Sequence, residues 1–399
     1  MSESIPPWPR STVFGSVMRE WESIWPYNAA QTMVLTTPMS LSRVQASLDT
    51  ALESVGIAWL GASPVVSAID PVSHIAQQMN KPFAPHDPPL RPFACGSHVG
   101  LVYRHWPLDS VSVRLLMRRW FESLHDLPPD APPLFELHEP PMPVWRSLFK
   151  HPGRLIDEYK QARLQKQVRR LAPSPARSHD VGFIVLAQPA QPVDVGPMLR
   201  AVRDRGLSLN DLFLAAAAII CHRLFAPDSP SRTWLTIGTI VDARSIDDRD
   251  LVGLKLAFDR TAFPPESLGS IDATLTHLAL KPRDKPTLAH SNWRLASMLR
   301  WTRNDTPEQR LEFYRKRVAA SGGISNVNLD RDWPAIHFPD RLRGYFRTSP
   351  LGPALPLVFA PTTLGQSVNV TMTYRRDLLD PAQAASTLEE FLRLIQSLS

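Results

Sequence analysis

The chain has 399 residues, a formal net charge of +6 and an apolar fraction of 43%. This length exceeds one ordinary hydrophobic core and predicts two domains of about 200 residues each, or one large domain with insertions. The apolar fraction is typical of a globular protein and excludes a disordered chain. No apolar run approaches the roughly 18 residues of a membrane-spanning helix. Residues 1–11 lack a signal-peptide pattern, so we expect a cytoplasmic protein.

The first half of the chain predicts two well-marked helices. Residues 40–54 place Leu41, Val44, Leu48 and Leu52 on one face, with Ser40 or Ser42 as the N-cap. Residues 97–125 begin as an alternating apolar strand and continue as a helix for which Ser110 is a plausible cap.

His105 and Asp109 lie between that strand and that helix, in the order His-x-x-x-Asp. Catalytic groups are common on loops that a rigid sheet positions. The spacing by itself is weak evidence, and a histidine bonded to the backbone at a strand end is the alternative.

After His125 the chain continues with a proline-rich segment and then a predicted helix at 153–171. The polar segment that follows this helix predicts a domain linker, and we place the domain boundary near residue 180. His138 and Glu139 have no third ligand in register, and Cys95 and Cys221 lie far apart, so no metal site is expected. The cysteines are expected to be free thiols.

The second half alternates strands and helices. The run from Leu212 to Leu224 is apolar on almost every face and predicts a helix buried in a core. A later strand ends with Asp242 and Arg244, two charges that must be paired or exposed. The predicted fold class is α/β or α+β, with one plan repeated in residues 1–180 and 181–399.

The net positive charge is compatible with binding to nucleic acid, to an anionic membrane surface, or to an acidic small molecule or protein. The first two partners usually require a concentrated basic stripe, and only residues 154–177 approach one. We therefore expect an acidic small-molecule or protein partner and no nucleic acid. The sequence does not indicate an oligomeric state.

Five phrases occur in an order that resembles one superfamily: HWPLD, SLNDLFLAAAAI, a strand ending in DAR, SNVNL after a glycine pair, and NVTMTYRRDLLDP with its C-terminal helix. The superfamily contains chloramphenicol acetyltransferase, the condensation domains of peptide synthetases, the plant BAHD acyltransferases and the bacterial wax ester synthases. The resemblance runs from about residue 30 to the C-terminus.

The resemblance implies two similar subdomains packed around a central channel. The family motif is His-His-x-x-x-Asp-Gly, and its second histidine corresponds to His105, which would be the general base. Its aspartate corresponds to Asp109, which in relatives shapes the loop by pairing with an arginine of the second subdomain. Arg244 is the candidate for that arginine.

Two positions depart from the motif. Arg104 replaces the first histidine, and Ser110 replaces the glycine. A cation at position 104 disfavours a protonated His105. Ser110 adds a side chain at a position where relatives have none, which would narrow or shift the channel. Together with Ser325 and Asn326, from a segment that relatives bring near the channel, these residues are the substrate-channel candidates.

The function that the resemblance implies is acyl transfer from a thioester donor, either acyl-CoA or an acyl carrier protein, to a hydroxyl or amine of a small-molecule or lipid acceptor. The thioester is a substrate, and no cofactor is expected. The alternative is a catalytically inactive condensation-like homologue that binds or docks a partner, which Arg104 and Ser110 would favour.

Overall fold

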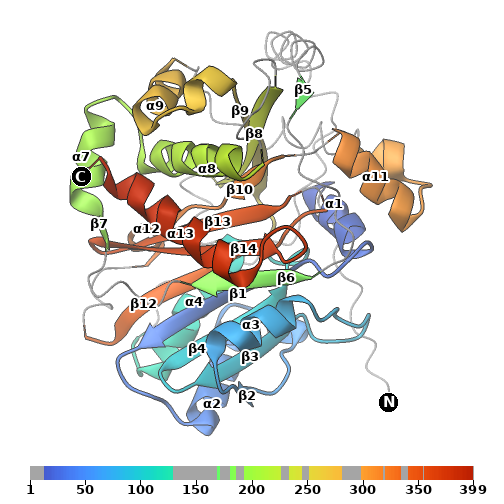
Figure 1. Cartoon of the computed structure of the whole chain (residues 1–399). Coiled ribbons are helices and arrows are strands. Elements are labelled where there is room, and N and C mark those ends of the chain that lie inside the picture. The colour runs from blue at the N-terminus through green and yellow to red at the C-terminus, as the bar shows by residue number, and fades with distance from the viewer. Residues whose placement is uncertain are drawn as a thin grey trace. The chain divides into compact units, whose positions relative to one another are not determined.

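A computed structural model describes residues 13–128, 169–170, 180–185, 193–225, 233–244, 251–280, 298–317, 320–333, 340–353 and 355–398 (Figure 1). The chain divides into two compact units. Unit 1 comprises Met1–Pro141, Asp242–Leu256 and Asn328–Pro350, and unit 2 comprises Met142–Val241, Ala257–Val327 and Leu351–Ser399.

Unit 1 contains a five-stranded sheet in the order β12-β1-β4-β3-β2. Its strands are β1 (Asn28–Leu35), β2 (Val66–Ser67), β3 (Leu90–Cys95), β4 (His98–Arg104) and β12 (Leu342–Thr348). The interior strand β1 pairs antiparallel with β4 on one side and with β12 on the other, so Gln31 lies between Leu101 and Arg347. Because β12 comes from the last third of the chain, the sheet of unit 1 is complete only after most of the chain has been synthesised.

Helices cover both faces of this sheet. They are α1 (Val13–Glu22), α2 (Leu41–Ser54), α3 (Pro71–Met79) and α4 (Ser110–Leu124), with the 3-10 turn η1 (Ala58–Leu60). The Asn28 side chain donates to backbone carbonyls at the end of α3, whereas that of Gln31 donates to the Ser110 carbonyl at the start of α4. Side chains an odd number of residues apart on a strand point to opposite faces. The ends of α3 and α4 that meet β1 therefore lie on opposite faces of the sheet.

Unit 2 is built on a larger sheet with the strand path β5-β8-β10-β13-β14-β6, to which β7, β9 and β11 attach. The strands are β5 (Arg169–Arg170), β6 (Val181–Val185), β7 (Val193–Asp194), β8 (Thr233–Asp242), β9 (Leu256–Phe263), β10 (Gly322–Ile324), β11 (Val327–Asn328), β13 (Leu357–Leu364) and β14 (Ser367–Arg375). Parallel pairs join β10 to β8 and β13, and antiparallel pairs join β14 to β13 and β6.

The core of unit 2 forms around α8 (Leu209–Phe225), in which every residue from Leu212 to Cys221 is buried. Phe391 of α13 (Pro381–Gln396) stacks on Phe359 of β13 at 4.3 Å between ring centroids. Figure 1 shows α8 and α13 next to each other over the sheet. The remaining helical elements that the structure describes in full are α7 (Val195–Arg203), η2 (Pro265–Leu268), α9 (Ile271–Ala279), α11 (Pro307–Arg317) and the short α12 (Leu329–Asp332), which belongs to unit 1.

The mixed α/β class and the pair of units agree with the sequence analysis, and Ser40 caps α2 as expected. The single predicted boundary at residue 180 differs from the observed division. Residues Asp242–Leu256 and Asn328–Pro350 return to unit 1, because β12 completes its sheet through hydrogen bonds that no local pattern encodes. The predicted helix 153–171, the basic stretch 154–177 and the His138–Glu139 pair lie mostly or wholly outside the described residues.

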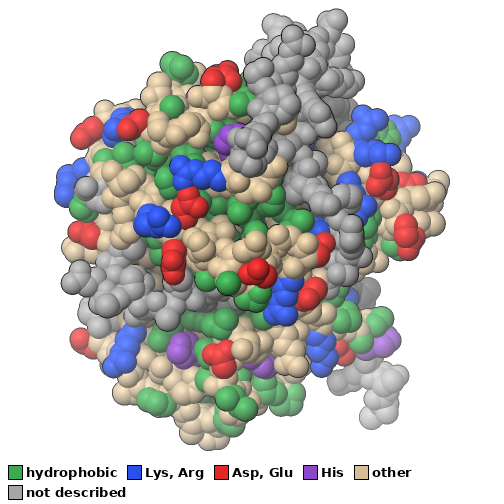
Figure 2. Space-filling view, in the orientation of Figure 1, with side chains coloured by type: hydrophobic (Ala, Val, Ile, Leu, Met, Phe, Trp, Pro, Cys, Tyr) green, Lys and Arg blue, Asp and Glu red, His purple; other side chains and the backbone are tan. Residues whose placement is uncertain are grey.

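On the face shown in Figure 2, Lys and Arg side chains are interspersed with Asp and Glu side chains and do not gather in one stripe. Among the described helices, none is long and apolar enough to cross a membrane. The same part of the chain contains no group of three or more His, Cys, Asp or Glu side chains that could hold a metal ion.

The packing of β4 predicts that Gly100→Ala destabilises the protein. A Cβ atom at Gly100 would lie 2.7 Å from the Phe93 ring and from Thr32 Oγ1, and 2.9 Å from the Gln31 carbonyl oxygen. Because a backbone atom of the interior strand β1 cannot move aside, we expect a loss of about 1–3 kcal/mol in the free energy of unfolding, measured by denaturant titration. Gly269→Ala, whose Cβ meets nothing within 4 Å, is the control. Equal stabilities would contradict the described packing.

Candidate functional site

His105 lies in the loop between β4 and α4, directly after the last residue of the strand. Its backbone N–H donates to the Tyr27 carbonyl at 3.3 Å, and its ring lies between those of Tyr27 and Tyr103, at 5.7 and 5.6 Å between centroids. The residue is 7% exposed. The sheet and two aromatic rings therefore fix a histidine that is almost enclosed in unit 1.

The surroundings of His105 keep it neutral. Burial lowers its pKa to about 4, while its own backbone carbonyl and the Asp109 carboxylate act in the opposite direction. Its Nδ1 atom is buried without a hydrogen-bond partner among the described residues. The sequence analysis expected a neighbouring cation to disfavour the charged ring, but the main cause is burial.

Asp109 is the N-cap of α4, and its Oδ1 accepts hydrogen bonds from the backbone N–H and the hydroxyl of Ser112, each at 2.8 Å. Its Oδ2 accepts from the Lys255 backbone N–H at 3.1 Å. The expected cap, Ser110, is instead the first helical residue. A carboxylate at this position satisfies orphan N–H groups and complements the positive end of the helix dipole.

Arg244 forms a bidentate ion pair with Asp109, with Nη1 to Oδ2 at 2.9 Å and Nη2 to Oδ1 at 3.1 Å. Both side chains are buried, with exposures of 1% and 0%. The remaining guanidinium hydrogens have acceptors in the Leu251 and Gly253 carbonyls and the Asp242 carboxylate. The expected contact is thus present, but Arg244 belongs to unit 1 with Asp109 rather than to a separate C-terminal domain.

Burial alone would raise the pKa of Asp109, but the Arg244 guanidinium and the N–H groups of Ser112 and Lys255 outweigh it and lower that pKa. Burial likewise acts against the charge of Arg244, and Asp109 raises the pKa of the guanidinium above its ordinary value. Both groups are therefore charged at neutral pH. With all its oxygens occupied, Asp109 has a structural part in the loop, as the resemblance implied for relatives.

Ser110 belongs to a buried polar network on the α4 side of the sheet. Gln31 Nε2 donates to its carbonyl at 2.9 Å and to its hydroxyl at 3.2 Å, and Arg114 donates to the same two atoms at 3.3 Å. Tyr345 in turn donates to Gln31 Oε1, and Arg114 pairs with Asp332 at 2.8 Å. The hydroxyl that replaces the motif glycine is thus accommodated by hydrogen bonds.

Arg104, the other departure from the motif, pairs with Glu22 of α1, with Nε to Oε1 at 2.7 Å. The side chains are 11% and 14% exposed. The positive charge next to His105 is therefore balanced locally.

Ser325 and Asn326 lie in unit 2, between β10 and β11. The Ser325 N–H donates to the Phe359 carbonyl at 2.9 Å, which continues the pairing of β10 with β13. The Asn326 side-chain oxygen is buried without a hydrogen-bond partner among the described residues.

The sequence analysis missed several residues around the loop. Ser112 lies three residues after the N-cap, where a capping partner is common, so this position carried a readable signal. Tyr27, Gln31 and Tyr345 carried none, because strand pairing across long sequence separations brings them together.

A scan against models of known protein families finds no match, and a sequence comparison with curated proteins finds none either. Solved structures do match. The starter condensation domain of rhizomide synthetase, in complex with C8-CoA, superposes with a TM-score of 0.63 at 14% identity, over 98% of this chain and 94% of that one.

The first condensation domain of the calcium-dependent antibiotic synthetase gives a TM-score of 0.60 at 14% identity, covering 98% and 96% of the two chains. The epimerization domain from the third module of tyrocidine synthetase B gives 0.58 at 13% identity, with the same coverage. The chain therefore has the fold of condensation domains, which is the fold that the sequence resemblance predicted.

The buried ion pair predicts strong coupling between Asp109 and Arg244. Asp109→Asn keeps the helix cap but removes the charge, and Arg244→Gln removes the guanidinium. Each change leaves an uncompensated buried charge and should cost about 3–5 kcal/mol of unfolding free energy, while the double variant should cost less than the sum. The control Asp272→Asn removes the exposed pair with Arg205 and should cost at most about 1 kcal/mol. Strictly additive losses would refute the coupling.

The lowered pKa of His105 predicts a pH-dependent stability. The unfolded chain binds a proton at this residue below about pH 6.5, whereas the folded protein does so only near pH 4. The unfolding free energy should therefore fall by on the order of 3 kcal/mol as the pH drops through this window.

In His105→Gln this loss should be absent, so its stability should decline less steeply over the same pH range. The matched control is His86→Gln, which removes a histidine that is exposed rather than buried. A slope unchanged by His105→Gln would show that the ring is not held neutral.

Proposed function

We propose that the protein is an acyltransferase that moves an acyl group from a thioester to a hydroxyl or amine acceptor, with His105 as the general base. The observation that carries this proposal is a neutral, nearly buried histidine at the end of β4, held by the Asp109–Arg244 pair, in a chain with the condensation-domain fold. The same fold in relatives supports acyl or aminoacyl transfer.

The proposed step needs one imidazole. As the acceptor oxygen or nitrogen attacks the thioester carbonyl carbon, its proton passes to His105 and the carbonyl electron pair moves onto oxygen. Collapse of the tetrahedral intermediate re-forms the carbonyl, breaks the carbon–sulfur bond and expels the thiolate, which takes the proton from His105. Protons and charge balance, and no acyl-enzyme is required.

The ring nitrogens are assigned from their burial. Nδ1 contributes nothing to the residual exposure of His105, so Nε2 is the proposed proton acceptor. Because desolvation disfavours the imidazolium, the ring is ready to accept a proton at neutral pH but is a weaker base than a solvated histidine.

The proposed donor is acyl-CoA or an acyl carrier protein, and the acceptor is a small molecule or a lipid. Both donors are anionic and complement the net charge of +6, and the rhizomide relative is described in complex with C8-CoA. Ser325 and Asn326 of unit 2 are proposed as polar groups that contact the substrate.

The test is thiol release, with intact-mass detection of the acylated acceptor, over a panel of acyl-CoA and acyl carrier protein donors with alcohol and amine acceptors. His105→Gln should lower kcat/KM by about 10²- to 10⁴-fold, and His86→Gln should not. The acid limb of kcat/KM in the wild type should lie nearer pH 4 than pH 6.5, since it reports the free enzyme.

Turnover that survives His105→Gln would refute the assigned base. A tight carrier-protein complex without turnover for any acceptor would favour the alternative, a binding protein with the same fold.

A further inference from the structure

The helix α1 contacts the residues on both sides of His105. Arg104 pairs with Glu22 at the end of α1. The Arg19 guanidinium, one turn earlier, stacks over the Trp106 ring at 4.1 Å from its centroid. Arg104 itself lies 5.6 Å from the same ring. Two guanidinium groups and one carboxylate therefore fasten the loop at positions 104 and 106.

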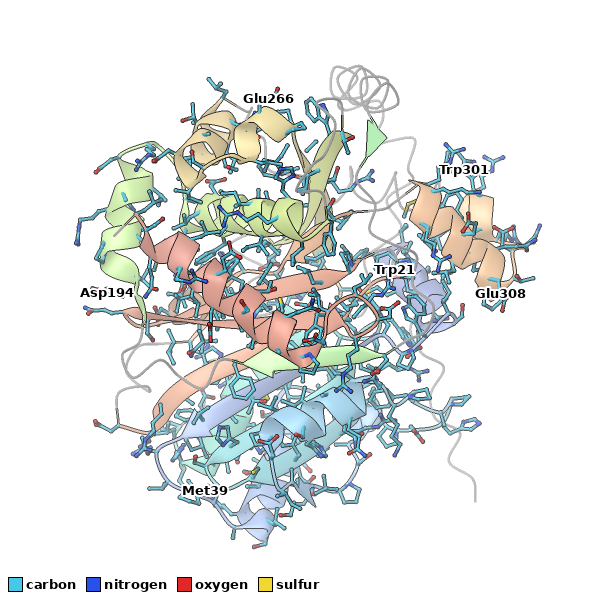
Figure 3. The ribbon with its side chains drawn as sticks, in the orientation of Figure 1. Trp21, Met39, Asp194, Glu266, Trp301 and Glu308 are labelled. Carbon is cyan, nitrogen blue, oxygen red and sulfur yellow. The ribbon has the colours of Figure 1, made fainter. Side chains whose placement is uncertain are left out.

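A third contact connects α1 to the His105 ring through Tyr27. Trp21, labelled on α1 in Figure 3, meets Tyr27 edge to face at 5.2 Å, and Tyr27 is one of the two rings against His105. The Tyr27 carbonyl also accepts the His105 backbone N–H. All these residues belong to unit 1, so α1 and the loop form one packed body.

The Arg104–Glu22 pair is suited to hold geometry. Both side chains are mostly withdrawn from water, where a charge-assisted hydrogen bond is stronger and more directional than on the surface. Arg104 is the last residue of β4 and directly precedes His105, so a shift of its side chain moves the peptide that carries the base. Glu22 is the last residue of α1, and so the pair joins the end of a helix to the end of a strand.

We propose that Arg104 and Glu22 are positioning residues that hold His105 in one ring orientation by tying its loop to α1. This inference rests on the proposed function for its catalytic meaning. It assigns a role to the arginine that stands where the superfamily motif has a histidine: the residue anchors the loop from the α1 side, while Asp109 and Arg244 anchor it from the other end.

The charged and titratable groups near His105 are known from the described elements packed around it. Arg104, Glu22 and Arg19 lie on the β4 and α1 side. Tyr27 and Tyr103 face the ring, and Asp109 lies at the start of α4. A change confined to Glu22 or Arg104 leaves the last three in place.

The experiment follows the ring nitrogens of His105 by NMR of the full chain labelled with ¹⁵N-histidine, the signal being assigned by its loss in His105→Gln. The variants are Glu22→Gln and Arg104→Met, which each remove one charge of the pair at similar side-chain length. The control is Asp126→Asn, which breaks the exposed Arg43–Asp126 pair elsewhere in unit 1.

In the wild type and in Asp126→Asn we expect one fixed tautomer of His105. In Glu22→Gln and Arg104→Met the tautomers should average. The midpoint of the His105 titration should rise by about one pH unit in Arg104→Met, because water reaches the ring and a cation is removed. It should rise less in Glu22→Gln, because the uncompensated Arg104 and Arg19 guanidinium groups disfavour the imidazolium. Arg104→Lys keeps the positive charge but loses the several N–H donors of the guanidinium. Its His105 signals should lie between those of the wild type and those of Arg104→Met. A purely structural pair would lower the melting temperature and leave the His105 signals unchanged, and that result would overturn the proposal.

If Arg104→Met does not fold, the His105 ring ¹⁵N signals of Glu22→Gln and Arg104→Lys test the positioning proposal. Turnover separates the two proposals. A wild type without transferase activity but with the expected NMR changes refutes the proposed function alone. An active wild type whose pair variants keep both kcat and the His105 signals refutes the positioning proposal alone.

Discussion

The organisation of the candidate site depends on the buried ion pair between Asp109 and Arg244. Removing two charges from water is costly, and this cost is met only when the geometry is close to ideal and the remaining donors and acceptors are satisfied. Here the carboxylate accepts from the guanidinium and from two backbone N–H groups, and every guanidinium hydrogen has an acceptor. The pair therefore specifies one arrangement of the start of α4 and of residues 242–244 and 251–255.

The loop between β4 and α4 is held at both ends by charges. Asp109 fixes its second end to Arg244, and Arg104 fixes its first end to Glu22. Between these anchors His105 bears no charge at neutral pH, because burial lowers its pKa to about 4. A neutral imidazole between two compensated ion pairs suits proton acceptance, since neither pair leaves a net charge close to the ring.

The departures from the superfamily motif are compensated within unit 1. Ser110 adds a hydroxyl where the motif has glycine, and Gln31 and Arg114 donate hydrogen bonds to it. Arg104 adds a cation where the motif has histidine, and Glu22 neutralises it. Such compensation keeps the loop ordered with the altered sequence and is compatible with an intact base.

The sequence by itself determined what depends on local pattern. It indicated the mixed α/β fold, the helix at 40–54 with Ser40 or Ser42 as its cap, the strand and helix around His105, and the buried helix at 212–224, because periodicity and capping act within a few residues. The partnership of Asp109 with Arg244 came from the resemblance. Only the tertiary structure decided the composition of unit 1 and the contacts of Arg104 and Ser110. These depend on β12 pairing with β1 and on α1 packing at the loop, between segments that are distant in the chain and carry no local signal of one another.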